Sequence, residues 1–327
     1  MTATAEHDGP SYALSGWIEA AIYVFAIGVL SLVYVVAGRL GAHPIAFVLD
    51  SMLLSAIVML AITGLGPDWR EIVLMPRSWL VGIGTIMMEY FYFVLLGQVG
   101  PAQGSIMIRL AIPASLAIGW VLFRRRPVGL QMAGAAIVAA SILPLFGNVA
   151  PDRMALAAGA AAGCIAMFNL RSFAAEFHPA NRRARGIKEK VRLTGLVVLV
   201  TSIAGLAAVG CVALAIEGGL VEPTGLVPSL AAMLHGPTLL LATFAGSVIL
   251  TAMAYLNYSC VVKITTENFA AMTAFTPIAT FAVQELAVHA GFLAPLAIDP
   301  LLMISMGVVV AGVMVMLIGV RRARNRA

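Results

Sequence analysis

The sequence predicts an all-α integral membrane protein that crosses its membrane ten times. Of its 327 residues, 61% are apolar and only 11% are charged, which leaves too little polar surface for a soluble chain of this length. Ten apolar runs are each long enough to span a bilayer, which takes about 20 helical residues. Nearly all Lys and Arg residues fall on one side of these runs, as the positive-inside rule requires of a multi-pass protein.

The predicted spans follow one another with short connections that carry turn signals, such as Gly66-Pro67-Asp68 and Asp299-Pro300. The sixth connection is the exception, because it is longer and basic. No Lys or Arg precedes Trp17, and no cleavage site follows the first run, so we expect that run to be retained as a span. The predicted spans are 16–38, 43–65, 78–97, 101–123, 127–147, 153–177, 193–216, 234–262, 267–293 and 300–320.

The distribution of positive charge predicts the orientation. If the N-terminus lies inside, the inner segments hold sixteen Lys and Arg residues and the outer segments hold only Arg39 and Arg153. We therefore expect an N-in/C-in, multi-pass protein of the cell inner (plasma) membrane. The predicted organisation is a cytoplasmic tail at 1–15, five-helix repeats at 16–147 and 153–320, a basic cytoplasmic loop at 180–192 and a basic tail at 321–327.

The two halves of the chain share a weak internal similarity. An offset of 164 residues places Gly82 on Gly246, Phe91 on Tyr255 and Pro113 on Pro277. Each proline then lies within the fourth span of its half. An odd number of spans in each half would invert the second half relative to the first. The sequence therefore predicts two inverted five-helix repeats, an architecture in which a solute site lies between the repeats.

One segment carries a family pattern. It runs from Ala254-Tyr255 through Thr265-Thr266, Asn268 and Ala271 to Pro277. Together with ten short spans in two halves, a proline in each fourth helix and an aromatic-rich third helix, it resembles the EamA family of the drug/metabolite transporter superfamily. This resemblance implies secondary transport or export of small organic solutes.

The chain departs from that family in two places. Family members often end the fourth helix of a repeat with a Gly-Glu pair, and here that place holds Arg124-Arg125-Arg126-Pro127. A basic residue is common early in the second helix of the family, and here the charge is the acidic Asp50.

Four ionisable residues lie deep in predicted spans: Asp50, Glu89, Arg109 and Glu285. Glu89 lies eight residues before Gly97 and Arg109 eight residues after Pro101, so both are expected roughly 12 Å below the same membrane face. Counted in the same way, all four share one layer and are expected to meet in one polar cavity. Charge inside a membrane is costly and marks a functional site by default. Two accounts stay open for Glu89 and Arg109: mutual neutralisation, or a solute site.

The predicted site residues have distinct chemical roles. Arg109 would present a planar donor fork to a carboxylate or phosphate, and Glu89 or Asp50 would meet an amine. Glu285 and Glu89 are the proton-coupling candidates, because burial favours protonation of a carboxylate. Helical spacing adds further candidates for substrate binding, and prolines in two spans are candidate hinges, each an alternative to a static kink. The added substrate-binding residues are Tyr92, Trp120, Thr273 and Gln284, and the hinge candidates are Pro113 and Pro277.

Two predictions concern lipid. Arg171 is expected to extend to the inner headgroups, and the basic connection from Arg182 to Arg192 is expected to lie on anionic lipid.

These residues favour a secondary transporter that exports a small polar metabolite such as an amino acid, by alternating access with proton coupling. An importer of a cationic metabolite and a non-transporting membrane subunit remain as alternatives. The sequence contains no P-loop, no His-Glu-x-x-His and no Gly-x-Ser-x-Gly motif, so we expect no enzyme activity, cofactor or metal. The expected partners are a small-molecule solute and membrane lipids, with no nucleic acid, and the expected state is a monomer or homodimer.

Overall fold

A computed structural model describes residues 10–184, 186–222, 227–292 and 299–324. Within these residues all regular structure is helical, and ten helices are long and apolar enough to cross a membrane. The ten predicted spans are thus confirmed, with ends that differ by a few residues. The observed spans are Tyr12–Arg39, Pro44–Thr63, Pro76–Val99, Pro101–Phe123, Gly129–Gly147, Pro151–Glu176, Ile187–Glu217, Leu230–Ile264, Thr266–His289 and Pro300–Val320.

Seven spans are continuous helices. Several begin with a proline, which lacks an N–H and therefore suits the first turn, where N–H groups have no helical partner. These seven are α1 (Pro10–Arg39), α2 (Pro44–Thr63), α4 (Pro76–Val99), α7 (Gly129–Gly147), α8 (Pro151–Glu176), α10 (Ile187–Glu217) and α16 (Pro300–Arg324). Short helices α3 (Trp69–Leu74) and α9 (Pro179–Arg183) lie in the connections, and α11 (Leu230–Met233) begins the eighth span.

The other three spans are interrupted. The fourth consists of α5 (Pro101–Met107), a 3-10 turn η1 (Ile108–Leu110) and α6 (Ala111–Phe123). The ninth consists of α14 (Thr266–Met272), a 3-10 turn η3 (Thr273–Phe275) and α15 (Thr276–His289). The eighth contains a π-helical turn, η2 (Ala242–Gly246), between α12 (Gly236–Leu241) and α13 (Ser247–Ile264). Such departures from α-helix often occur at functional positions.

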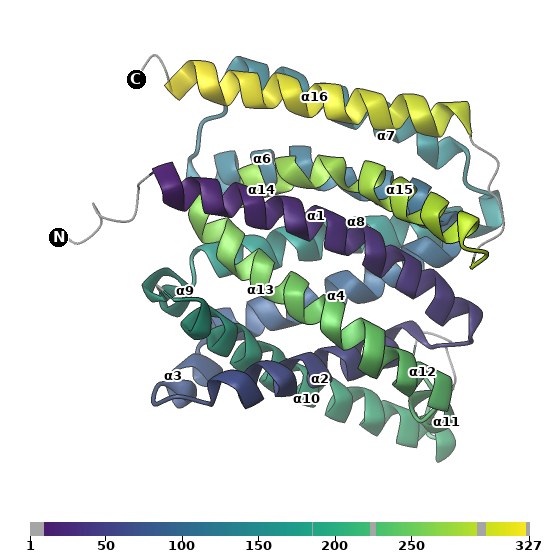
Figure 1. The fold of residues 1–327 in the computed structure, drawn as a ribbon. Coiled ribbons are helices and arrows are strands. Elements are labelled where there is room, and N and C mark those ends of the chain that lie inside the picture. Colours follow the sequence, from purple (N-terminus) through teal and green to yellow (C-terminus); the bar gives the residue numbers. More distant parts are fainter. Residues whose placement is uncertain (1–9, 185, 223–226, 293–298, 325–327) are drawn as a thin grey trace.

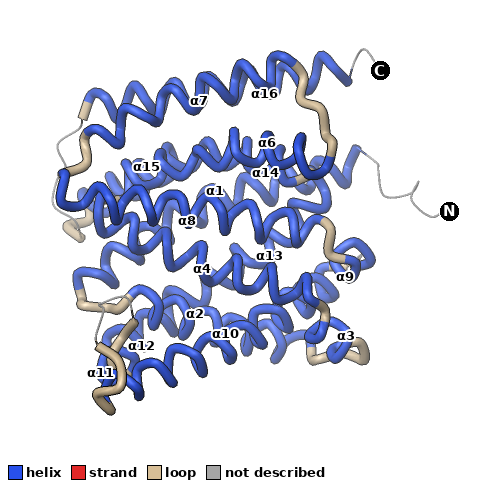
Figure 2. Tube along the Cα trace, turned by 180° about the vertical axis from the view of Figure 1, so that it is seen from behind, coloured by secondary structure: helices blue, strands red, loops and turns tan. Residues whose placement is uncertain are grey.

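The helices form one bundle with two distinct ends (Figure 1). The start of α1, the end of α16, α3 and α9 lie at one end, and α11 and α12 lie at the other. We call the first the basic end, because it carries Arg77, Arg125, Arg182 and Arg183, and the second the opposite end. Both views place α7 beside α16 on one flank and α2 beside α10 on the other (Figure 2). The remaining spans fill the centre, where α1 packs along α13 and α4 along α8.

Glycines allow two of these helix pairs to approach closely. A Cβ at Gly134 of α7 would lie 2.3 Å from the carbonyl oxygen of Gly312 in α16. On α8, a Cβ at Gly163 would lie 2.8 Å from the ring of Phe91. In membranes, small residues of this kind allow backbones to pack by van der Waals contact.

The basic connection differs from the prediction, because residues 180–192 are not a continuous loop. Helix α9 occupies Pro179–Arg183, and α10 begins at Ile187. Lys190 is only 3% exposed within α10. Arg183 pairs with Glu71 at 3.0 Å, so part of this charge serves contacts within the bundle.

Candidate functional site

Arg109 is a buried cation in the centre of the bundle. It lies in the 3-10 turn η1 and is 3% exposed. Its Nε donates to the carbonyl of Ser105 at 2.9 Å, and its Nη1 donates to the carbonyl of Thr273 at 2.5 Å. Among the residues that the structure describes, Arg109 has no carboxylate partner. An unpaired charge in such a place is costly, which marks it as a candidate anion-binding group.

Pro277 explains the carbonyl that receives Arg109. A helical proline cannot donate to the carbonyl four residues earlier, and four residues before Pro277 is Thr273. The freed oxygen accepts the guanidinium instead. Pro113 stands in the same relation to the carbonyl of Arg109 itself. The predicted prolines therefore lie in the first turns of α6 and α15, just after the two 3-10 turns. The contact between Arg109 and Thr273 joins the first five spans to the last five.

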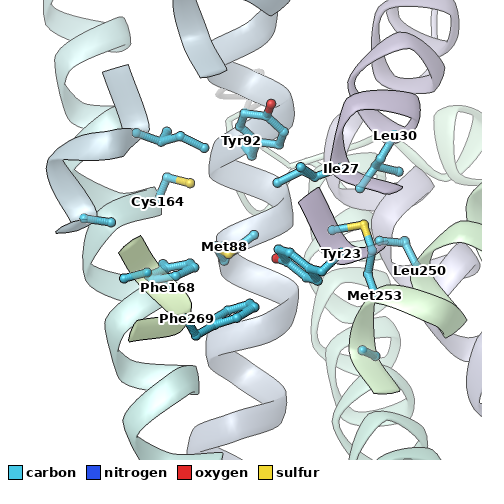
Figure 3. Close-up of a cluster of buried hydrophobic side chains, with 14 of the residues drawn as sticks. Tyr23, Ile27, Leu30, Met88, Tyr92, Cys164, Phe168, Leu250, Met253 and Phe269 are labelled. Atoms are coloured by element: carbon cyan, nitrogen blue, oxygen red, sulfur yellow. The ribbon is translucent and has the colours of Figure 1, made fainter. Parts of the chain in front are cut away.

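A small cavity adjoins Arg109. Its volume is about 10 Å³, roughly the space of one water molecule. Tyr23 of α1, Met88 of α4 and Cys164 and Phe168 of α8 line it together with Arg109. Figure 3 shows the first four of these side chains gathered from three helices around one point. In this state the centre of the bundle is closed around a single cation.

Glu89 pairs with Arg171 of α8 and not with Arg109, which excludes mutual neutralisation, one of the two accounts left open by the sequence. The Glu89 carboxylate accepts from Arg171 at 3.5 Å and from the Tyr34 hydroxyl at 2.9 Å. The Arg171 Nη2 also donates to the Tyr23 hydroxyl at 2.5 Å. Both charged side chains are almost fully buried, and the pair again connects the first five spans to the last five.

The prediction that Arg171 extends to the headgroups is also wrong. Arg171 is only 1% exposed. A Cβ at Gly84 of α4 would lie 3.0 Å from the Cβ of Arg171, so the close crossing of α4 and α8 holds the arginine against the neighbouring helix. Its guanidinium also lies 5.7 Å from the ring centre of Phe168, within the range of a cation–π contact.

A large vestibule opens at the opposite end of the bundle. Its volume is about 570 Å³. Arg39 and Arg153 line it near the surface, and Tyr34, Phe93 and Leu96 line it towards the centre. Tyr34 therefore faces the vestibule and also donates to Glu89. The vestibule leads from two exposed arginines to the buried ion pair.

Aromatic rings separate the vestibule from the central cavity. Tyr34 stacks on Phe93 with ring centroids 4.7 Å apart, and Phe47 meets both rings edge to face. Tyr92 lies 6.1 Å from Tyr34, and its hydroxyl is 2.7 Å from that of Ser31. Rings packed in this way exclude water. The barrier is one side chain thick between Glu89 and the vestibule, because Tyr34 contacts both.

Ion pairs close the basic end. Arg125, from the connection after α6, binds Glu267 of α14 at 2.7 Å and also Glu176 of α8. Glu176 accepts from the backbone and hydroxyl of Thr266 at 3.0 and 2.7 Å. Arg124 makes this geometry possible, because it takes a left-handed conformation (φ 56°) that ends α6. The arginine run that follows α6 thus contributes an electrostatic closure at the basic end.

Two further ion pairs reinforce that closure. Lys263 of α13 binds Glu19 of α1 at 2.6 Å, and Arg183 binds Glu71 at 3.0 Å. Each joins the first five spans to the last five. Within the described residues, the one ion pair at the opposite end, Arg153 with Asp152, lies inside a single helix. The two ends are therefore closed to different degrees.

Loss of the Arg125 network is expected to open the basic end selectively. In Arg125→Gln, Glu176 and Glu267 lose a shared cation, which costs about 3 kcal/mol for a partly buried pair. We expect amide hydrogen exchange to accelerate at least tenfold in 119–128 and 264–269. Exchange in 34–42 at the opposite end should stay unchanged. Arg153→Gln is the matched control, and equal exchange in wild type and Arg125→Gln would contradict the assigned closure.

The remaining predicted residues do not share one cavity. A separate opening of about 160 Å³ at the opposite end is lined by Gln284, Glu285 and Asp299. In that opening the Gln284 side-chain oxygen is buried and lacks a hydrogen-bond partner. Asp50 lies on α2 with one buried carboxylate oxygen that lacks a partner. Trp120 is 46% exposed on α6. The expected convergence of four charges is therefore wrong.

Four residues of the central site were not among the predicted ones: Tyr23, Tyr34, Cys164 and Arg171. Tyr23 and Tyr34 are eleven residues apart, which is three helical turns, so both lie on one face of α1. That spacing was the available signal. Cys164 carried none, because an isolated cysteine in an apolar run usually packs as a small hydrophobe.

His178 fixes the connection between α8 and α9 at the basic end. Its Nδ1 accepts from the backbone N–H of Asn181 at 3.4 Å, so its Nε2 carries the proton and donates to Ser78 at 2.9 Å. Ser78 in turn donates to the carbonyl of Ile72 at 2.5 Å. The neutral form of the His178 imidazole therefore makes both hydrogen bonds, one as acceptor and one as donor.

Acid is expected to loosen this contact. Burial, with the nearby cations Arg77 and Arg183, lowers the pKa of His178 from 6.5 to about 4. The unfolded chain then binds the proton more tightly, so stability falls as the pH drops from about 6.5 to about 4, by up to about 3 kcal/mol. Tm measured against pH should fall less steeply in His178→Gln than in wild type. Parallel curves would contradict the prediction.

Comparison with known proteins identifies the fold alone. No protein-family model and no curated protein matches the chain. A solved crystal structure, described only as that of a protein, resembles it with a TM-score of 0.59 and 20% identity, over 92% of this chain and 97% of that one. The whole arrangement of helices therefore recurs in a solved protein. The class defined so far is a multi-pass membrane protein with a charged site at its centre.

Proposed function

We propose that the protein is a secondary transporter, and specifically an exporter, of a small polar organic metabolite, and that it is not an enzyme. The observation that carries this proposal is Arg109, a buried cation that adjoins a closed cavity and has no carboxylate partner among the residues that the structure describes. Its contact with Thr273 joins the two groups of five spans. An intramembrane charge at such an interface is the expected position of a solute site in a carrier.

The interruptions of the fourth and ninth spans support an inverted repeat. Pro113 matches Pro277 at the offset of 164 residues, and the turn η1 falls within one residue of η3 at that offset. The helix contacts match as well. The first span of the first half, α1, packs along α13 in the third span of the second half. The first span of the second half, α8, packs in the same way along α4, the third span of the first half. Broken helices that meet at a repeat interface are typical of carriers that work by alternating access.

The unequal closure of the two ends supports the same cycle. Ion pairs join the helices at the basic end, while at the opposite end the described residues place aromatic rings between the vestibule and the centre. Such a state is occluded and faces the opposite end. By the charge distribution, that end is outside and the basic end is cytoplasmic.

Transport in proteoliposomes tests the proposal. Purified protein would be reconstituted and assayed with amino acids, amines, nucleosides and organic acids, against protein-free liposomes. At least one solute should cross faster with wild-type protein, and Arg109→Ala should remove that excess. If Glu89→Gln and Arg109→Ala both move the solute at the wild-type rate, the site assignment is wrong. If no solute crosses faster with wild type, the transporter proposal fails and a non-transporting subunit is favoured.

Proton coupling is the finer part of the proposal. Glu285 lines its own opening beside Gln284, apart from Arg109, so a proton and a solute would bind at different positions. An imposed pH gradient should accelerate wild-type transport, and Glu285→Gln should remove that acceleration. Glu89 is less suited to this role, because Arg171 already pairs with it.

A further inference from the structure

We propose that the transported solute is a small organic anion that bears a carboxylate or phosphate group and no ammonium group. This proposal rests on the transporter function and narrows its substrate class. It differs from the sequence-based expectation of an amino acid and from the alternative of a cationic metabolite. Two independent observations carry it: the charges around the central cavity and the charges around the vestibule.

The central site has a net charge of +1. Glu89 is neutralised by Arg171 at 3.5 Å and also holds the Tyr34 hydroxyl at 2.9 Å. Each of its oxygens already has a donor, and its charge is balanced, so Glu89 offers an ammonium group no net attraction. Arg109 remains without a carboxylate within the described residues, and its cavity neighbours Tyr23 and Cys164 carry no charge in their ordinary forms.

A bound anion would restore neutrality at this site. A guanidinium donates through several N–H groups in one plane and therefore matches carboxylate and phosphate oxygens. An ammonium group in the same cavity would add a second positive charge beside Arg109. Repulsion between like charges is strong where water is excluded, so the geometry disfavours both amines and amino acids.

The charges that line the vestibule also favour an anion, here near the surface. Two arginines and no acidic residue line it, although the charge distribution otherwise keeps Lys and Arg away from this end. Asp152 lies 3.9 Å from Arg153, but both side chains are more than half exposed, and such pairs are weak. A concave surface with one sign of charge raises the local concentration of the opposite ion.

Matched solutes test the proposal directly. Lactate, alanine and 1-amino-2-propanol have similar size but carry an anion, a zwitterion and a cation, and inorganic phosphate adds a second anion. The readout is the shift in Tm of the purified protein at low ionic strength, followed by transport. We expect lactate or phosphate to raise Tm and to be transported at least tenfold faster than alanine. The cation should have no effect.

Variants identify the residues responsible. Arg109→Gln should abolish the Tm shift, and Arg109→Lys should keep part of it. Arg39→Gln/Arg153→Gln should lower the transport rate about threefold at low salt and remove its salt dependence. Arg70→Gln, an exposed arginine at the basic end, is the control and should match wild type.

Cys164 gives a second readout that needs no choice of solute. It lines the central cavity with Arg109, so its modification reports which ions reach the site. An anionic sulfonatoethyl thiosulfonate should modify Cys164 at least tenfold faster than the cationic trimethylammonium-ethyl reagent, each rate being divided by that of the same reagent with a free thiol in solution. Peptide mass spectrometry separates the cysteines, and Arg109→Gln should remove the difference.

The outcomes separate this inference from the proposed function. Transport of alanine or of the amine, without transport of the anions, would overturn the anion assignment and leave the transporter standing. A Tm shift with either anion but no transport of any solute would refute the transporter function and retain the binding site. The absence of any effect of lactate and phosphate, or equal reactivity of Cys164 with both reagents, would contradict the inference.

Discussion

Arg109→Gln is expected to reduce solute binding at least a hundredfold while the protein stays folded. The loss follows because the guanidinium is the unpaired cation at the cavity, and removing one partner of a buried charged contact costs about 3 kcal/mol, or roughly a hundredfold in affinity. Stability should change by less than about 1 kcal/mol, since the substitution also removes an uncompensated buried charge. The glutamine amide occupies the position of the Arg109 Nε and can therefore still donate to the Ser105 carbonyl.

Two measurements on the same preparation check this prediction. Tm without solute reports the fold, and transport of the solute identified in proteoliposomes reports binding. Arg109→Lys is the matched variant, because it keeps the charge but loses the planar fork, and it should retain intermediate transport. A fall in Tm as large as the loss in transport would mean that Arg109 is a structural residue, and the proposed site would then be withdrawn.

Glu89→Gln is expected to have the opposite signature, a large loss of stability. It leaves the Arg171 guanidinium buried without its carboxylate, and breaking a buried pair in this way costs about 3 to 5 kcal/mol. The same change replaces the charged acceptor of the Tyr34 hydroxyl by a neutral amide oxygen, which weakens that hydrogen bond, and Tyr34 lines the vestibule. We therefore expect a lower Tm and a barrier that opens more readily.

Removing the second charge should restore the fold. In Glu89→Gln/Arg171→Gln, both buried charges are absent, so the double variant should recover at least about 2 kcal/mol relative to the sum of the single variants. Denaturation in detergent of the four proteins completes this cycle. Additive effects would show that Glu89 and Arg171 do not interact. Glu89 would then be available to an ammonium group, contrary to the anion proposal.

The fold class could be predicted because a bilayer imposes strict conditions on a sequence. Every span must be long, apolar and internally hydrogen-bonded, so the ten spans were visible as apolar runs with Pro and Gly at their ends. The connection at 180–192 was harder to predict. Its charges suggested a loop, whereas burial against the bundle allows Lys190 to lie within α10.

The central site was predicted only in part, since depth in a membrane does not give the angle around a helix. Counting residues from the turns led to Arg109 and Glu89 as deep charges. Their partners depend on which helices cross, and the contact of Gly84 with the backbone of Arg171 could not be read from either segment alone. Arg171 lies five residues before the end of α8 and therefore resembled an interfacial residue.

Pro277 gives the site a dependence on a residue that contributes no polar group to it. An ordinary amino acid at this position would offer its own amide to the Thr273 oxygen, and that amide would compete with the Arg109 guanidinium. The Arg109 guanidinium therefore keeps this acceptor because proline has no N–H to compete for it. A straightened helix would release it, and any motion of the ninth span that repositions this carbonyl would turn Arg109 along with it, so backbone shape and charge placement would change as one event.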